Sequence, residues 1–213
     1  MSTETKQRDE MVLLARSMFE RGLTPGSSGN LSCRLEDGGF LMTPTNSSFG
    51  FLDAETLSKL DDNGEFVSGD KPTKEDFLHL AMYRGRPETK AVTHLHSTHC
   101  VCLSCLKDID DTNMIPPMTP YVHMRVGAIA AAPYKRPGDK SLGPDIQKLA
   151  EKHSGIIIKN HGPVVASKSM RDSVFAMEEL EEAARVFLIT RGMDLDLLSD
   201  ADLAELDAIK LGR

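Results

Sequence analysis

Strand-like and helix-like segments alternate along this chain of 213 residues, and that alternation limits the folds open to it. Two pairs of short apolar segments are divided by the turn sequences EDGG at 36–39 and DDNG at 61–64, which predict two β-hairpins. Hairpins interleaved with helices favour a mixed α/β fold around a mostly antiparallel sheet. No internal repeat, linker or low-complexity tract interrupts the pattern, so we expect a single domain over residues 1–213.

The spacing of apolar residues predicts where the individual elements lie. Thr73 is expected to cap a helix that turns Phe77, Leu80 and Ala81 towards the core. The predicted helices span residues 5–21, 73–84, 98–106, 141–153 and 169–191, and an acidic helix is expected in the last thirteen residues. Besides the hairpin around 61–64, the predicted strands span residues 31–35, 40–43, 91–97, 155–159 and 163–167.

The composition is that of a soluble globular protein, with 40% hydrophobic and 27% charged residues. Acidic residues outnumber basic ones by 32 to 25, which argues against a nucleic acid as the main partner. No apolar run reaches 18 residues and the opening MSTETKQRDE is almost entirely polar, so neither a membrane span nor an export signal is expected. We therefore expect a cytoplasmic protein.

Three of the four cysteines, Cys100, Cys102 and Cys105, lie within six positions, which is too local for a disulfide framework. This spacing favours a reduced, cytoplasmic setting. The chain has no second cysteine pair that could complete a structural four-ligand metal site. We therefore expect these cysteines to pack as small apolar side chains rather than to bind metal.

The most informative segment is AVTHLHSTH at 91–99. On a strand, residues two apart share a face, so His94 and His96 could reach one ion, although an exposed sheet face could also carry such a pair. His161 is the best third ligand because it ends an apolar strand at Gly162, where the backbone can turn sharply; a core histidine bonded to backbone is the alternative. Three histidines would leave a coordination position open, as in catalytic zinc sites.

Glu75 is the candidate acid/base residue. It is expected in the first turn of a helix, where free backbone N–H groups favour an anion, although many carboxylates merely complement the helix dipole there. The loops at 27–30, 43–46 and 73–74 offer hydroxyl and amide groups that could hold a phosphate, but turns of this composition are common. The histidines expected to be structural or solvated rather than ligating are His79, His99, His123 and His153.

Taken in order, five segments resemble the class II aldolase/adducin family over residues 8–192. These segments are GSSGNLS at 26–32, LMTPT at 41–45, KPTKE at 71–75, AVTHLHSTH at 91–99 and IIIKNHGPV at 156–164. The resemblance implies a three-layer α/β/α sandwich around a largely antiparallel sheet. It also implies a homotetramer with active sites near subunit interfaces.

The resemblance also implies a role for each site residue. It makes His94, His96 and His161 the ligands of one zinc ion per subunit, with other divalent metals possible, and Glu75 the acid/base. The residues that it implies for binding the substrate phosphate are Gly29, Asn30, Thr45, Asn46, Thr73 and Lys74. The sugar-phosphate aldolases commonly carry glycine in place of Asn46 and paired serines in place of Thr73–Lys74. The substrate therefore need not be a simple aldol sugar.

Within the family, MIPPMTPYVHMRVG at 114–127 and APYKRPGD at 132–139 are most similar to the enzymes that decarboxylate 3-oxo-tetronate 4-phosphates in acid-sugar catabolism. Tyr121 then falls where those enzymes have a proton donor. The implied reaction is a carbon–carbon lyase reaction that yields dihydroxyacetone phosphate and CO2 through a metal-stabilised enediolate. Retro-aldol cleavage shares that intermediate, so a fuculose- or ribulose-phosphate aldolase or 4-epimerase is an alternative. A non-catalytic, adducin-like interaction module is a further one.

Overall fold

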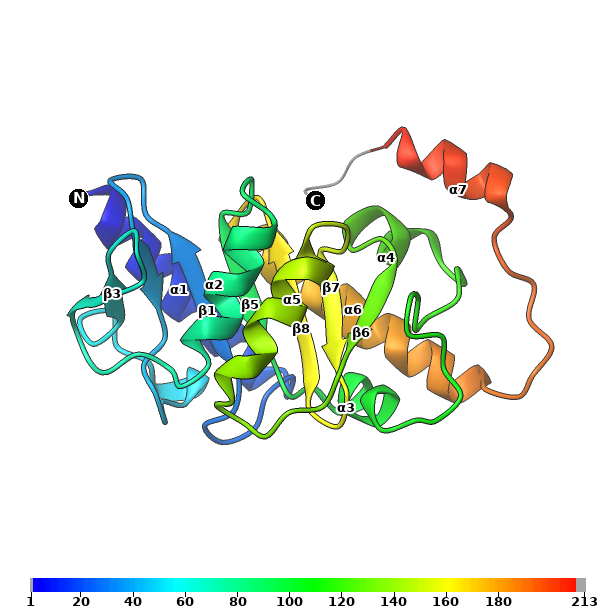
Figure 1. Cartoon of the computed structure of the whole chain (residues 1–213), viewed down its shortest axis with the longest axis horizontal. Helices are drawn as coiled ribbons and strands as arrows, with labels where there is room; N and C mark the ends of the chain where they lie inside the picture. Colours follow the sequence, from blue (N-terminus) through cyan, green and yellow to red (C-terminus); the bar gives the residue numbers. More distant parts are fainter. Residues whose placement is uncertain (1, 210–213) are drawn as a thin grey trace.

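The structure, a computed structural model that describes residues 2–209, is built on one eight-stranded sheet (Figure 1). Its strands are β1 (Asn30–Arg34), β2 (Phe40–Met42), β3 (Ser58–Leu60), β4 (Phe66–Ser68), β5 (Ala91–His94), β6 (Ile129–Ala132), β7 (Gly155–Ile158) and β8 (Gly162–Ser167). They lie in the order β4-β3-β2-β1-β5-β8-β7-β6. Only β6 and β7 pair in parallel among these neighbours, so the prediction of a mostly antiparallel sheet is confirmed.

Helices cover both faces of the sheet. They are α1 (Thr3–Glu20), α2 (Asp76–Gly85), α3 (Thr98–Ser104), α4 (Pro120–Arg125), α5 (Gly143–Ala150), α6 (Met170–Thr190) and α7 (Asp200–Asp207), with 3-10 turns η1 (Phe49–Phe51) and η2 (Lys140–Leu142). In Figure 1, α2 and α5 lie in front of the sheet, and α6 passes behind it. The predicted three-layer α/β/α arrangement is confirmed.

The two faces of the sheet belong to two separate apolar clusters. Along β7, Ile156 and Ile158 pack with the α2 and α5 side, whereas Ile157 packs with the α1, α3 and α6 side. This alternation follows from the two-residue period of a strand, which sends successive side chains to opposite faces. A strand buried on both faces therefore reads as the continuous apolar run seen in the sequence.

Most predicted elements are present, with ends that differ by a few residues. Both predicted hairpins form, as β1–β2 and β3–β4. The acidic C-terminal helix is α7, which ends at Asp207, and residues 210–213 of the predicted segment lie outside the described residues. The elements that were not predicted are the 3-10 turn η1, the helix α4 and the alanine-rich β6 that supplies the parallel edge of the sheet.

The prediction for the start of α2 is wrong. The helix begins at Asp76 with Glu75 as its N-cap residue, so Thr73 lies two residues before the cap. The Thr73 hydroxyl does accept a hydrogen bond from the Glu75 N–H at 3.3 Å, but residues 74 and 75 form a turn that precedes the helix rather than its first turn. Of the predicted inward-facing residues, Ala81 is buried, but Phe77 and Leu80 are only partly buried.

Helix α2 instead buries a face that includes a histidine. His79 is fully buried against the sheet, and burial lowers its pKa from 6.5 to about 4, although the negative charge of Glu75 opposes that shift. The imidazole is therefore neutral in the folded protein at neutral pH. In the unfolded chain it would take up a proton below about pH 6.5.

We expect the free energy of unfolding to fall as the pH drops from about 6.5 towards about 4. In that interval the unfolded chain binds a proton at His79 that the folded protein does not bind, so protonation favours unfolding. The His79 contribution is roughly 3 kcal/mol over the interval. Urea denaturation of the wild type and of His79→Gln across this range measures it. A difference between the two proteins that does not vary with pH would contradict the expectation.

Within residues 2–209, no helix combines the length and the apolar character needed to cross a membrane.

Candidate metal centre and active site

The ends of three neighbouring strands meet at one edge of the sheet and carry polar side chains there. Asn30 begins β1 and pairs with His94, the last residue of β5. His94 also pairs with Val164 of β8. His161 lies in the short turn between β7 and β8, beside the same edge. The antiparallel register therefore brings residues from distant parts of the sequence to one place.

Four side chains converge at this edge and could hold a metal ion: Glu75, His94, His96 and His161. One potential ligand atom from each lies within 4.8 Å of all the others. The Nε2 atoms of His96 and His161 are 2.9 Å apart, and Glu75 Oε1 lies 3.2 Å from His161 Nε2. Glu75 Oε2 lies 3.4 Å from His94 Nε2. We call these four residues the histidine–glutamate cluster.

The environment of His94 fits a metal ligand. Its Nδ1 lies 2.8 Å from the Pro163 carbonyl oxygen, which can only accept, so Nδ1 carries the hydrogen and Nε2 presents a lone pair. That Nε2 is fully buried and has no hydrogen-bond partner. A buried acceptor without a partner is costly, and a cation at the cluster would remove that cost. Backbone carbonyls orient metal-bound histidines in this manner.

The ionisation of the cluster is also suited to a cation. Burial lowers the pKa of His94 to about 3, although the negative charge of Glu75 opposes that shift, and burial likewise lowers the pKa of His96. Burial raises the pKa of Glu75, but His94, His161 and Asn30 outweigh it, so that this pKa lies below its ordinary value. Neutral imidazoles and an ionised carboxylate are the forms that bind a divalent metal.

His96 reaches the cluster in a different way from the one predicted. Strand β5 ends at His94, and the predicted strand to residue 97 is wrong, because Leu95 and His96 belong to the connection that leads into α3. The Leu95 N–H still donates to the Pro163 carbonyl at 3.3 Å, which keeps this connection beside β8. In the first turn of α3, the N–H groups of His99 and Cys100 donate to the buried Glu181 carboxylate.

The turn that carries His161 depends on two neighbouring residues. Asn160, rather than Gly162, has the left-handed conformation of the tight turn, with φ of 54°. Gly162 is needed for a different reason, because a Cβ atom there would lie 2.5 Å from the Leu95 carbonyl oxygen. The left-handed turn residue is therefore Asn160, while Gly162, with φ of 158°, occupies a position that requires glycine.

The six predicted phosphate-binding residues line one pocket together with Glu75 and His96. Its volume is about 270 Å³. The segments that form it are tied together by the Thr45 N–H, which donates to the Lys71 carbonyl at 2.9 Å, and by a bridge between Pro44 and Pro72. The predicted residues in the lining are Gly29, Asn30, Thr45, Asn46, Thr73 and Lys74. The pocket therefore places hydroxyl, amide and ammonium groups beside the histidine–glutamate cluster.

Sequence reasoning did not assign Pro137 and Gly138, which also line this pocket. They belong to the segment APYKRPGD that follows β6, and the Pro-Gly pair in it is a turn signal. Because β6 itself was not predicted, nothing in the local pattern indicated that this turn would reach the loops at 27–30 and 44–46.

The remaining candidates lie away from the cluster. Tyr121 lies on α4 and is 56% exposed. Helix α4 precedes the start of β6, which pairs with Gly155 at the start of the parallel strand β7. His161 follows the end of β7, so the two residues lie at opposite ends of these strands. Cys100 is buried as predicted, but Cys102 and Cys105 are exposed, so the expectation that they pack in the core is wrong.

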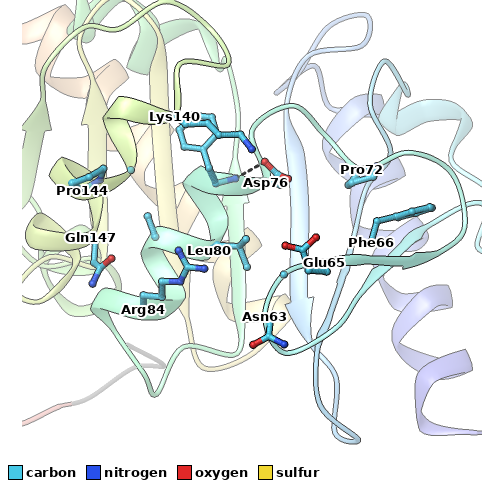
Figure 2. Close-up of a pocket in the computed structure, with 14 residues that line it drawn as sticks. Asn63, Glu65, Phe66, Pro72, Asp76, Leu80, Arg84, Lys140, Pro144 and Gln147 are labelled. Atoms are coloured by element: carbon cyan, nitrogen blue, oxygen red, sulfur yellow. Dashed lines mark hydrogen bonds between the residues drawn. The ribbon is translucent and has the colours of Figure 1, made fainter.

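Figure 2 shows a larger pocket, of about 480 Å³, between α2, the start of α5 and the β3–β4 hairpin. Leu80, Arg84 and Asp76 of α2 point into it, facing Phe66 and Glu65 of the hairpin. Its lining includes none of the four cluster residues. Volume alone therefore does not identify the reactive site.

Comparison with known proteins gives the family. The sequence model of the class II aldolase and adducin N-terminal domain matches residues 9–188. This chain belongs to the class II aldolase and adducin family. The match covers the four cluster residues and all six residues of the predicted phosphate site, so the class II aldolase candidate site lies within the shared domain.

Individual family members match nearly the whole chain. The 3-oxo-tetronate 4-phosphate decarboxylase of Pectobacterium atrosepticum is 50% identical over 97% of this chain and 94% of its own. The L-fuculose phosphate aldolase of Methanococcus maripaludis is 34% identical over 86% of this chain and 97% of its own. The crystal structure of YgbL from Escherichia coli superposes with a TM-score of 0.94 at 46% identity, covering 96% and 99% of the two chains.

Proposed function

We propose that this protein decarboxylates a 3-oxo-tetronate 4-phosphate to dihydroxyacetone phosphate and CO2. The observation that carries the proposal is 50% identity over 97% of the chain to a relative of that name. The L-fuculose phosphate aldolase relative is more distant, at 34%. The activity makes the protein a carbon–carbon lyase that acts on a small phosphorylated sugar acid.

We further propose that the cluster holds one zinc ion per subunit through His94, His96 and His161. Three imidazole nitrogens are a usual ligand set of catalytic zinc, and the buried, partnerless Nε2 of His94 supports the assignment. Bound there, the metal would act as a Lewis acid towards the negative charge that develops on the substrate carbonyl oxygen as CO2 leaves.

The pocket beside the cluster suits the phosphate of the substrate. Thr45 and Thr73 offer hydroxyl groups, Asn46 offers an amide, and the exposed Lys74 offers a positive charge. Asn30 also lines the pocket, although its side-chain amide bonds to Glu75 and His79. Gly29 brings the backbone close to β5, because a Cβ atom there would lie 3.1 Å from the His94 carbonyl oxygen. Phosphate binding would orient the reacting carbons towards the cluster from a distance.

Decarboxylation of a β-keto acid also requires a proton on the carbon that loses its carboxylate. Glu75 is the acid/base residue of this proposal, because its carboxylate lies in the cluster and lines the phosphate pocket. Tyr121 could act only from another copy of the chain, since it lies at the opposite end of the sheet. We therefore propose that Tyr121 of a second subunit completes each site, within the homotetramer that the family resemblance implies.

The alternative is a sugar-phosphate aldolase or 4-epimerase, which the 34% identical aldolase relative supports. Retro-aldol cleavage leaves the same kind of enediolate, so the cluster could serve either reaction. A non-catalytic interaction module has less support, because all four cluster residues and the adjoining phosphate pocket are present.

The test compares the two bond cleavages directly. The zinc-loaded protein is incubated with 3-oxo-tetronate 4-phosphates of both configurations at C2, and CO2 and dihydroxyacetone phosphate are measured. L-fuculose 1-phosphate and L-ribulose 5-phosphate are assayed in parallel for aldehyde release or epimerisation. Equal release of CO2 and dihydroxyacetone phosphate supports the proposal. Aldehyde release without CO2 would replace it with the aldolase alternative.

A further inference from the structure

A line of buried hydrogen bonds runs from the core beneath α2 to the carboxylate of Glu75. Tyr83 Oη lies 2.8 Å from Ser32 Oγ, which lies 2.7 Å from His79 Nδ1. His79 Nε2 lies 2.5 Å from Asn30 Oδ1, and Asn30 Nδ2 donates to Glu75 Oε2 at 2.9 Å. Strand β1 and helix α2 with its N-cap residue thus contribute to one continuous line of hydrogen bonds, which starts in the apolar core and ends in the candidate active site.

The chemistry of each group sets the direction of these bonds. Asn30 Oδ1 can only accept, so the nearby His79 Nε2 must carry its hydrogen. In a neutral imidazole Nδ1 is then an acceptor, and the Ser32 hydroxyl donates to it. The Tyr83 hydroxyl in turn donates to Ser32. Every bond therefore points towards Glu75, with no donor facing a donor.

The opposite arrangement would disrupt the site. If His79 carried its hydrogen on Nδ1, its Nε2 would accept from the Asn30 amide nitrogen. The Asn30 carbonyl oxygen would then face the Glu75 carboxylate, placing two acceptors within hydrogen-bond distance. The His79 tautomer thus determines which end of the Asn30 amide meets Glu75.

The burial of these residues argues for a role beyond packing. His79 and Ser32 are completely buried and Tyr83 nearly so, among apolar side chains of the α2 side of the sheet. A polar chain in such a place adds to stability only when every member is satisfied, and apolar residues would fill the volume as well. This line of hydrogen bonds orients the Asn30 amide, which apolar residues could not do.

We propose that His79 is a positioning residue for the reaction. Its Nε2–H donates to Asn30 and so turns the amide N–H of Asn30 towards Glu75. That N–H in turn holds the Glu75 carboxylate beside His94, His96 and His161. The His79 side chain bonds to Ser32 and Asn30 rather than to a member of the histidine–glutamate cluster, and it acts through Asn30. The proposal rests on the proposed acid/base role of Glu75.

The activity test compares three variants with the wild type, all loaded with zinc. His79→Leu removes the donor to Asn30, whereas His79→Gln keeps a side-chain N–H. Tyr83→Phe is the matched control, because it also removes a buried polar group but leaves the bonds from Ser32 to Glu75 intact. We expect His79→Leu to lower kcat at least ~10-fold with KM changed less than about threefold. His79→Gln should recover most of kcat, and Tyr83→Phe should stay within about twofold of wild type.

A second measurement needs no substrate and therefore does not depend on the reaction assigned to the protein. In nitrogen-15 NMR spectra of the wild type, His79 should be protonated on Nε2 and bare on Nδ1. The side-chain amide signal of Asn30 should move in His79→Leu and stay in place in Tyr83→Phe. If His79→Leu does not fold, the tautomer in the wild type and in Ser32→Ala still tests the chain.

Several outcomes would overturn the proposal. These are an Nδ1-protonated His79 in the wild type, equal loss of kcat in His79→Leu and Tyr83→Phe, or no recovery in His79→Gln. A wild-type protein that has the expected tautomer but releases no CO2 would instead count against the proposed function. In that case the variants are assayed with the aldol substrate that the protein does cleave.

Discussion

Replacing His94 by alanine is expected to abolish metal binding and activity together while leaving the fold intact. The variant loses one of the three nitrogen ligands of the proposed site, so only His96 and His161 remain beside Glu75, the proposed acid/base residue. Metal stabilisation of a developing charge is worth several kcal/mol, so kcat/KM should fall at least ~1,000-fold. Metal content by atomic emission, circular dichroism and the CO2 assay measure the three effects.

His153→Ala is the matched control for this variant. Like His94, His153 directs Nδ1 at a backbone carbonyl, that of Ala128 at 2.9 Å, but it lies outside the histidine–glutamate cluster. It should retain full zinc and activity. Neither variant should lose much stability from the carbonyl that its histidine contacted, because the Leu95 N–H still donates to Pro163 and the exposed Ala128 carbonyl can bond to water. Stoichiometric zinc in purified His94→Ala would remove His94 from the metal site.

Replacing Glu75 by glutamine is expected to lower kcat at least ~100-fold with substrate binding retained. Glutamine has nearly the same shape and can still accept from Asn30, but it cannot hold or deliver the proton that the reacting carbon requires. A loss of this size is usual when acid–base help is removed. Single-turnover rates and the dissociation constant of the substrate separate the chemical step from binding.

Asp76→Asn is the control for Glu75→Gln. Asp76 is the adjacent carboxylate, but it lines the pocket of Figure 2 and accepts a hydrogen bond from the Phe77 N–H at 2.7 Å. Removing its charge should leave kcat within about twofold of wild type. Zinc must also be measured in Glu75→Gln, because loss of metal would explain a low rate without acid–base chemistry. Near-normal turnover with zinc present would exclude Glu75 from the mechanism.

Several structural features could be predicted because they depend on local chemistry. Turn sequences such as DDNG specify hairpins through the backbone conformations that Asn and Gly tolerate. The run at 155–158 specifies a buried strand because both faces of β7 meet apolar clusters. The start of α2 could not be predicted in the same way, because the hydrogen bond from the Glu75 N–H to Thr73 forms in a turn that precedes the helix.

Some residues of the candidate site could likewise be predicted from the sequence, and others could not. Residue type, spacing and resemblance identified four candidate metal ligands, because few kinds of side chain bind a divalent metal. They are His94, His96, His161 and Glu75. His79 was expected to be structural, and its hydrogen bonds to Asn30 and Ser32 join residues 47 to 49 positions apart, which no local pattern shows. Pro137 and Gly138 line the pocket beside the cluster, and their position there likewise depends on the unpredicted strand β6.

The sequence by itself determined the alternation of strands and helices, the family and the candidate metal-binding side chains. These depend on the chemistry of single residues and on periods of two to four positions. Only the tertiary structure decided that the ends of β1, β5 and β8 meet and that Glu75 is the N-cap residue of α2. It also decided that hydrogen bonds connect His79 to Glu75 through Asn30. Such contacts form between segments far apart in the chain, and their geometry follows from sheet register and helix packing rather than from neighbouring residues.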